Sequence, residues 1–269
     1  AVDTVYEQLK NGKTIYTYGP IVHNEKAVRE LAEKGVRVLE SKEELKNLKA
    51  GETIPTVIIR AHGVAKEIYD IMEANGLECI DATCPFVKKI HRIVEQKSTE
   101  GYHVIVVGDP KHPEVEGIVG WCQGPVTVLE TPEQAENFVK TEGEKLCIVS
   151  QTTYNYNKFQ YIVEIFEKKG YNDSVVNTIC NATEERQRSA KAIAAEADVM
   201  IVIGGKHSSN SRKLYEICQR ECVHTYFIQT LDDLHLDLPK AVRLVGITAG
   251  ASTPNNIIEE VQEHVRIKF

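Results

Sequence analysis

Residues 199–210 read VMIVIGGKHSSN. The five apolar residues that end at a Gly-Gly pair predict a buried strand, and the polar residues after them open a helix-periodic segment. Similar apolar or β-branched runs recur at intervals of roughly 20 to 28 residues, each followed by a helical pattern. This alternation is typical of α/β folds with parallel sheets.

The repeated runs predict eleven strands, which is too many for one regular sheet. The predicted strands are Thr14–Tyr18, Val36–Val38, Thr56–Ile59, Glu78–Asp81, His103–Val107, Thr127–Leu129, Leu146–Ser150, Ser174–Asn177, Val199–Ile203, His224–Ile228 and Leu244–Thr248.

The helix boundaries carry matching signals. Ser41 with Glu44 and Thr131 with Gln134 have the spacing of capping boxes, in which the two side chains bond to each other's backbone N–H groups. Helix ends are predicted at four glycines, a residue type that adopts the left-handed conformation after a helix. These glycines are Gly35, Gly76, Gly101 and Gly170.

Grouping the strands in sets of about four predicts three similar small α/β units with mainly parallel sheets, packed pseudo-symmetrically around a shared centre. The predicted units are residues 1–82, joined by a C-terminal helix at 254–269, then residues 83–177 and residues 178–253. A chain of 269 residues is long enough for more than one core.

The composition excludes several classes of protein. With 42% hydrophobic and 26% charged residues, the chain is that of a folded globular protein. The net charge of −7 disfavours a nucleic-acid-binding face. The longest apolar runs, such as Val199–Ile203, are far short of the roughly 18 residues of a membrane span. The first ten residues lack a signal-peptide pattern, so we expect a cytoplasmic protein with no membrane partner.

Histidines stand in three of the loops that follow predicted strands. His23, His62 and His112 each occupy such a loop, and Glu114 follows His112 by two residues. Taken singly, each has an ordinary explanation as a helix cap or a packed side chain. Because ligands of α/β folds bind beyond the carboxyl ends of parallel strands, the three together indicate a site.

A second group of loops has the character of an anion cradle. Gly204 and Gly205 allow close backbone approach, and the residues Ser208, Ser209 and Asn210 that follow offer neutral hydrogen-bond donors at the predicted start of a helix. Ser252, in another loop, adds a hydroxyl group. The pattern matches neither a Walker A loop nor a dinucleotide fingerprint, so a phosphate or diphosphate is the expected ligand.

Two of the seven cysteines occupy equivalent positions. Cys84 and Cys180 each precede a predicted helix, and their spacing is close to the repeat of the units. Continuing the repeat backward places a third cysteine roughly a dozen residues before Ala1. Three thiolates would leave one corner of an iron–sulfur cube open to a substrate oxygen.

Eight motifs in this order resemble the 4-hydroxy-3-methylbut-2-enyl diphosphate reductase family, iron–sulfur enzymes of the methylerythritol phosphate route to isoprenoids. The resemblance covers essentially the whole chain. The motifs are Val22-His23-Asn24, Arg60-Ala61-His62-Gly63-Val64, Asp81-Ala82-Thr83-Cys84-Pro85, His112-Pro113-Glu114-Val115, Ser150-Gln151-Thr152-Thr153, Ile179-Cys180-Asn181-Ala182-Thr183, Ser208-Ser209-Asn210-Ser211 and Thr248-Ala249-Gly250-Ala251-Ser252.

The resemblance implies a central 4Fe-4S cluster with three cysteine ligands and a fourth iron open to the substrate. Cys84 and Cys180 match two of the ligands, and the third is expected in a Gly-Phe-Cys motif upstream of Ala1, absent from this chain. The implied reaction reduces 4-hydroxy-3-methylbut-2-enyl diphosphate to isopentenyl and dimethylallyl diphosphate. The implied electron donor is a ferredoxin or flavodoxin.

The resemblance also implies roles for the residues in the loops. Glu114 would supply protons, Thr152 would link it to the substrate hydroxyl, and His112 would complete the catalytic group. The implied substrate-binding residues are His23, His62, His112, Thr152, Ser208, Ser209, Asn210 and Ser252.

The residues alone leave two alternatives open. A non-redox zinc phosphohydrolase would use His112, Glu114 and another histidine as ligands. An anion-sensing α/β binding protein would close on an anionic metabolite without any chemistry, and it would need no thiolates.

Overall fold

The computed structural model describes residues 2–22, 25–51, 53–171, 173–235 and 242–268. Its described strands form three sheets with parallel pairing throughout. In each sheet the first strand in sequence is central, with the second on one side and the third on the other. This repeated order confirms the predicted α/β class with several small parallel-sheet units.

The first sheet has the order β2-β1-β3-β4 and carries helices on both faces. Leu45 of α3 and Ile68 of α4 pack against Val57 on one face. Val5 of α1 and Leu31 of α2 belong to the core on the other. The elements are α1 (Val2–Lys10), β1 (Ile15–Tyr18), α2 (Glu25–Glu33), β2 (Arg37–Leu39), α3 (Lys42–Asn47), β3 (Thr56–Ile59), α4 (Lys66–Ala74) and β4 (Glu78–Asp81).

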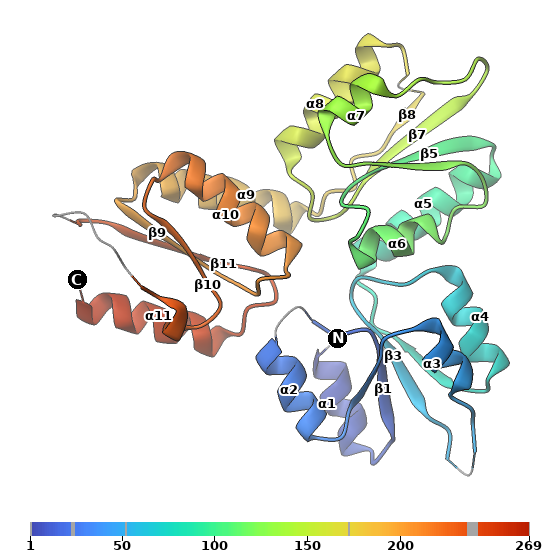
Figure 1. Cartoon of the computed structure of the whole chain (residues 1–269), viewed down its shortest axis with the longest axis horizontal. Helices are drawn as coiled ribbons and strands as arrows, with labels where there is room; N and C mark the ends of the chain where they lie inside the picture. The colour runs from blue at the N-terminus through green and yellow to red at the C-terminus, as the bar shows by residue number, and fades with distance from the viewer. Residues whose placement is uncertain (1, 23–24, 52, 172, 236–241, 269) are drawn as a thin grey trace. The chain divides into compact units, whose positions relative to one another are not determined.

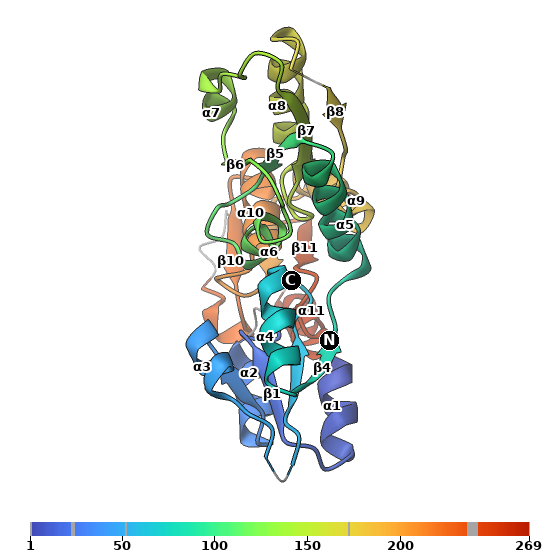
Figure 2. The same ribbon diagram turned by 90° about the vertical axis from the view of Figure 1, so that its right-hand side faces the viewer.

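The second sheet has the order β6-β5-β7-β8. Figures 1 and 2 show α5 and α6 on one side of β5 and β7, with α7 and α8 on the other, in agreement with two separate cores. Successive side chains along β5 point to opposite faces of the sheet. Ile105 therefore packs in one core and Val106 in the other. The elements are α5 (Pro85–Thr99), β5 (Tyr102–Val107), α6 (Pro113–Val119), β6 (Val126–Leu129), α7 (Pro132–Asn137), β7 (Lys145–Ser150), α8 (Tyr156–Lys168) and β8 (Ser174–Val175).

The third sheet has the order β10-β9-β11, with α9 and α10 on one face and α11 on the other (Figure 1). The central strand β9 is fully buried, as its five apolar residues predict. The elements are α9 (Asn181–Glu196), β9 (Val199–Ile203), α10 (Ser209–Glu221), β10 (Thr225–Ile228), the 3₁₀ helix η1 (Leu231–Asp233), β11 (Val245–Ala249) and α11 (Asn255–Lys268).

The C-terminal helix differs from its predicted place beside the first unit. Ile257, Val261 and Val265 of α11 pack against Val199 and Ile201 of the third sheet. The spacing of four residues between these side chains forms an apolar stripe, which covers the sheet face that α9 and α10 leave open.

The chain divides into two compact units within the described ranges. The first unit contains residues 2–22 and 26–179, and the second contains residues 180–268 with residue 25. The first unit therefore holds two sheets and the second unit holds one. The limits of the three predicted units remain a prediction.

The predicted strands and helix ends agree closely with the structure. All eleven predicted strands form, with ends that differ by no more than two residues. The four glycines predicted at helix ends have positive φ angles of 90°, 66°, 84° and 69°. Thr131 and Gln134 form the full capping box. Ser41 caps α3, but the Glu44 carboxylate accepts from the Glu40 N–H at 3.0 Å rather than from the Ser41 N–H.

The described residues contain no helix that is both long and apolar enough to cross a membrane.

A glycine permits close packing between α6 and the segment before α4. A Cβ atom at Gly120 would overlap the Cβ of Ala65 and lie 2.8 Å from its Cα. The backbone of Gly120 is in the ordinary right-handed region, with φ −69°. The constraint is therefore one of space, and it fixes how closely the end of α6 approaches Ala65.

We predict that Gly120→Ala lowers the free energy of unfolding by about 1–3 kcal/mol because the added methyl group overlaps a backbone atom. Gly51→Ala is the matched control, since no atom lies within 4 Å of a Cβ at that position. Urea unfolding measures both. Equal stability of the two variants would contradict the close approach of α6.

Candidate active site

The predicted site residues of the first unit lie just beyond the carboxyl ends of parallel strands, in loops or in the first turn of the next helix. His62 follows β3 and Cys84 follows β4, while Glu114 and Thr152 follow β5 and β7. Because β5 and β7 are hydrogen-bonded neighbours, their carboxyl ends present Glu114 and Thr152 to each other across 38 positions of sequence.

Thr152 holds both oxygens of the Glu114 carboxyl group. Its backbone N–H donates to Glu114 Oε1 at 2.6 Å, and its hydroxyl donates to Oε2 at 2.8 Å. Glu114 is only 2% exposed and Thr152 only 6%. Two hydrogen bonds of this kind fix the orientation of the carboxyl plane.

Burial raises the pKa of Glu114 to about 7, although the two hydrogen bonds from Thr152 act in the opposite direction. Desolvation is the largest influence on the pKa of Glu114. The other influences within the described residues are the two hydrogen bonds from Thr152, and none of them is a nearby positive charge. A carboxyl group with such a pKa holds a proton for a large part of the time near neutral pH. It is therefore suited to general acid catalysis.

Two histidines lie beside each other near this carboxyl group. The Nδ1 atom of His112 accepts a hydrogen bond from the Glu114 backbone N–H at 3.1 Å, which caps α6. This bond requires an unprotonated Nδ1, so His112 carries its proton on Nε2. The rings of His62 and His112 meet edge to face, with centroids 5.4 Å apart. The structure thus brings His62, His112, Glu114 and Thr152 together.

Cys84 and Cys180 occupy matching local positions. Each is the N-cap residue of a long helix, α5 or α9, and neither uses its side chain for the cap. Both thiols are free and partly exposed. The unpaired N–H groups at a helix N-terminus favour a negative charge, as a thiolate ligand requires. Cys84 lies in the first unit and Cys180 in the second.

Four of the other five cysteines are less suited to bind a metal. Burial raises the pKa of Cys79 and Cys218 to about 11 and that of Cys122 to about 12. Burial also raises the pKa of Cys147. A raised pKa disfavours the thiolate form that binds a metal.

The second unit contains the predicted anion loop. Ser208 is the N-cap of α10, and its hydroxyl accepts from the Ser211 N–H at 3.3 Å. Asn210 is 6% exposed, and both polar atoms of its side chain are buried without a partner in the part of the chain that the structure describes. A buried, unpaired amide costs about 1–3 kcal/mol, so its retention indicates a ligand.

The remaining predicted residues have less structural definition. Ser209 is the first residue of α10 and Ser252 follows β11, and both are partly exposed. His23 lies outside the described residues.

No three His, Cys, Asp or Glu side chains within the described ranges form a group that could hold a metal ion. The zinc site that a phosphohydrolase would need is not found there.

Sequence reasoning missed two buried residues next to these loops. His91 of α5 is 3% exposed and stacks on Trp121, with centroids 5.1 Å apart. Burial lowers the pKa of His91 to about 4, so this ring is neutral. Ser211 is fully buried beside Ser208. Its spacing of three residues from a helix N-cap is a signal that the sequence does contain.

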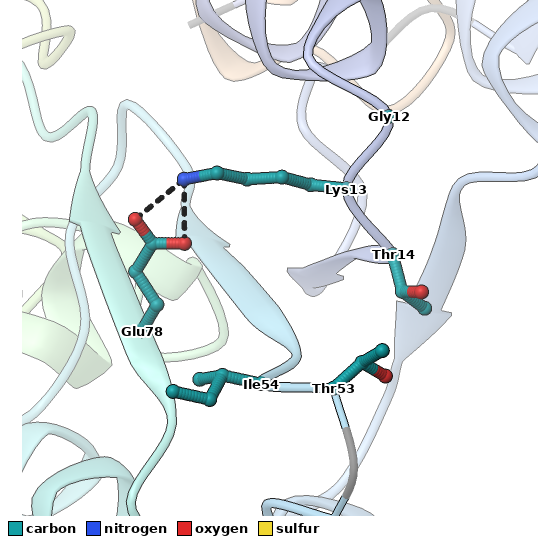
Figure 3. A pocket seen from close by; sticks show the side chains of 6 residues that line it. All are labelled: Gly12, Lys13, Thr14, Thr53, Ile54 and Glu78. Atoms are coloured by element: carbon teal, nitrogen blue, oxygen red, sulfur yellow. Dashed lines mark hydrogen bonds and ion pairs between the residues drawn. The ribbon is translucent and has the colours of Figure 1, made fainter.

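A hollow at the opposite ends of the first sheet's strands contains none of the predicted site residues. Figure 3 shows its lining, in which Lys13 reaches across to Glu78. The Lys13 ammonium lies 2.6 Å from Glu78 Oε1, and Thr56 also donates to this carboxylate. The two charged side chains among its described lining residues therefore pair with each other.

The fold and the loops define an α/β protein with a buried carboxyl group of raised pKa, two free thiols at helix N-termini and a serine-rich loop predicted to bind an anion. The chain belongs to the family described as LytB protein, whose model matches residues 1–266. This match confirms the family to which the motifs point.

Relatives with known names agree with this family. A 4-hydroxy-3-methylbut-2-enyl diphosphate reductase from Caldanaerobacter subterraneus subsp. tengcongensis is 46% identical over 268 residues, which are 99% of this chain and 91% of that protein. A second protein with that name, from Clostridioides difficile, is 46% identical over 255 residues, 94% of this chain and 88% of that one.

A solved structure also resembles this fold. The E-1-hydroxy-2-methyl-but-2-enyl-4-diphosphate reductase from Plasmodium falciparum superposes with a TM-score of 0.89 at 29% identity, over 97% of this chain and 81% of that chain. The fold class predicted from the sequence is confirmed by this similarity.

We predict that Glu114→Gln changes the pH dependence of stability. The folded-state pKa of about 7 lies above the 4.5 of the unfolded chain. The protonated carboxyl group therefore stabilises the fold fully below pH 4.5, and this stabilisation is lost as the pH rises through 7. A glutamine does not ionise. The stability of the variant relative to the native protein should thus increase by about 3 kcal/mol between pH 4.5 and pH 8.

Chemical unfolding across this pH range provides the measurement, with Glu116→Gln on the same helix as the control because Glu116 is exposed. A stability difference that does not change with pH would refute the raised pKa.

Proposed function

We propose that this protein catalyses the reductive removal of the hydroxyl group from 4-hydroxy-3-methylbut-2-enyl diphosphate, giving isopentenyl and dimethylallyl diphosphate. The observation that carries the proposal is the buried Glu114–Thr152 pair in a chain of the LytB family. The protein is accordingly an oxidoreductase of isoprenoid biosynthesis, with a small diphosphate as substrate.

The reaction consumes two electrons and two protons. The carbon–oxygen bond to the allylic hydroxyl breaks, one proton completes the departing water, and the second proton is added to the carbon skeleton. Hydroxide is a poor leaving group, so a proton must reach the oxygen as this bond breaks. The protein therefore needs a protonated group next to the hydroxyl in a site that excludes water.

Glu114 meets this requirement. Burial keeps a proton on its carboxyl group near neutral pH. When protonated, Oε2 can donate to the Thr152 hydroxyl, which lies 2.8 Å away, and that hydroxyl can donate its own hydrogen to the substrate. The Thr152 N–H on Oε1 keeps the carboxyl group aligned for this transfer. The proton thus moves from Glu114 through Thr152 to the leaving oxygen.

The diphosphate is assigned to neutral donors. His112 offers its Nε2 proton, with His62 beside it, and Ser208 and Asn210 offer a hydroxyl and an unpaired amide. Ser209, Ser252 and His23 complete the proposed group. Neutral donors bind a diphosphate mainly through hydrogen bonds, which fits a chain with a net charge of −7.

Cys84 and Cys180 would hold an iron–sulfur cluster. Their free thiols at helix N-termini fit thiolate ligands, and a third cysteine is expected upstream of Ala1. When bound, a 4Fe-4S cluster with three cysteine ligands supplies electrons and an iron open to the substrate. A ferredoxin or flavodoxin as electron donor, and a cytoplasmic location, remain predictions.

We predict that Cys84→Ser and Cys180→Ser each lose most of the iron and acid-labile sulfide after anaerobic reconstitution, because serine is a poor ligand for iron in such clusters. Cys79→Ser is the matched control, since Cys79 lies in the same unit as Cys84 and its raised pKa disfavours a thiolate. Iron and sulfide retained at native levels in both variants would overturn the ligand assignment.

We predict that Glu114→Gln keeps its iron and sulfide but loses about 10²- to 10⁴-fold in kcat, the usual contribution of a general acid. A glutamine preserves the shape and can still accept from the Thr152 N–H. The measurement is the rate of product formation with a chemical reductant, so that no partner protein enters the result. Glu116→Gln is expected to retain native turnover. Native turnover in Glu114→Gln would remove this residue from the mechanism.

A further inference from the structure

Ser211 is a fully buried hydroxyl residue that contacts the proposed diphosphate site through Ser208. Its exposed fraction is 0%. The Ser211 hydroxyl donates to Ser208 Oγ at 3.0 Å, and the Ser211 backbone N–H donates to the same oxygen at 3.3 Å. Ser208 Oγ therefore accepts two hydrogen bonds, both of them from one residue.

These two bonds determine what the Ser208 hydroxyl can do. A serine hydroxyl has two acceptor positions and one hydrogen to donate. Because Ser211 occupies both acceptor positions, Ser208 can act toward any other group only as a donor. Ser208 is 5% exposed, and within the described ranges its hydroxyl donates to no protein atom. This hydrogen is consequently directed toward a ligand that accepts hydrogen bonds, as a phosphate oxygen does.

Two strand ends enclose Ser211. Gly204 follows β9, and Gly250 follows β11. A Cβ atom at either glycine would overlap the Ser211 hydroxyl oxygen. The absence of a side chain at both glycines therefore leaves the room that the Ser211 hydroxyl occupies.

Asn210 provides an independent sign of a ligand at this helix start. Both polar atoms of its side chain are buried without a partner among the described residues. A ligand that accepts from the Ser208 hydroxyl can also accept from the Asn210 amide, two residues beyond the cap of the same helix.

We infer that Ser211 is a positioning residue for the diphosphate: its two hydrogen bonds fix the Ser208 hydroxyl as a hydrogen-bond donor toward the ligand. The inference rests on the proposed function, because it concerns the anion part of that site. Ser211 acts through Ser208, so its contribution should depend on the Ser208 hydroxyl.

A double-mutant cycle on the reconstituted holoenzyme tests this dependence. The variants are Ser211→Ala, Ser208→Ala and the double variant, with Ser189→Ala as a control because Ser189 is an exposed serine of the same unit. We expect S211A to raise the Kd for inorganic diphosphate and the KM for the allylic diphosphate about 3- to 10-fold, the effect of one hydrogen bond. The change in kcat should be less than about 2-fold, because the diphosphate is held equally before and during reaction.

In the S208A background, S211A should change the Kd by less than about 2-fold, since the bond it removes is already absent. S189A should bind as the native protein does. If S211A does not fold, Ser211→Cys replaces it in the cycle, because a thiol keeps nearly the same volume but is a weaker donor.

Three results would overturn the inference. A native Kd in S211A would show that Ser211 has no effect on the anion. An equal effect of S211A with and without the Ser208 hydroxyl would show a general structural role. If the native holoenzyme neither binds diphosphate nor turns over the allylic diphosphate, the proposed function is overturned as well. If turnover is normal and either of the first two results is found, only the role of Ser211 is overturned.

Discussion

The burial of one carboxyl group is the constraint on which the site depends. Glu114 stands in the first turn of α6, and α6 packs on the second sheet through Val115 and Ile118. This packing removes the carboxyl group from water, and among the described residues the groups that bind its oxygens belong to Thr152. The raised pKa of Glu114 follows from this arrangement, and so does its capacity to hold a proton.

The strand order of the second sheet brings the buried carboxyl group of Glu114 to Thr152. Glu114 and Thr152 meet because β5 and β7 are adjacent, although β6 lies between them in sequence. The capping bond to His112 Nδ1 links the histidine to the same helix turn. The N-terminus of α6 therefore positions both Glu114, which holds the proton, and His112, a proposed hydrogen-bond donor to the diphosphate. In the second unit, Ser208 and Ser211 form the corresponding arrangement at the start of α10.

Much of the fold could be predicted because its signals are local. An apolar run such as Val199–Ile203 specifies a buried strand, and a glycine with positive φ ends a helix. The partner of Glu44 and the position of α11 could not be predicted in the same way. The Glu44 carboxylate can accept from either of two adjacent backbone N–H groups, those of Glu40 and Ser41. The apolar stripe of α11 could pack on the open apolar face of any of the sheets.

The sequence predicts a set of candidate site residues, but it does not predict how these residues meet in space. The position of Glu114 and Thr152 in loops after strands indicated chemistry, and the family resemblance supplied their roles. Their direct contact depends on the strand order, which the sequence does not state. Ser211 belongs to one of the quoted motifs, but the sequence assigns it no role because its surroundings include two distant glycines, Gly204 and Gly250, whose missing side chains make room for its hydroxyl.

The most direct test of this account is the titration of the Glu114 carboxyl group itself. Infrared difference spectroscopy of the native protein and Glu114→Gln across pH isolates the carbonyl stretch of the protonated acid. The account predicts a protonated carboxyl band, absent from the variant, that disappears with a midpoint near pH 7. A midpoint near 4.5, the value of an unfolded chain, would show that Glu114 is ionised at neutral pH and would contradict its role as the proton donor.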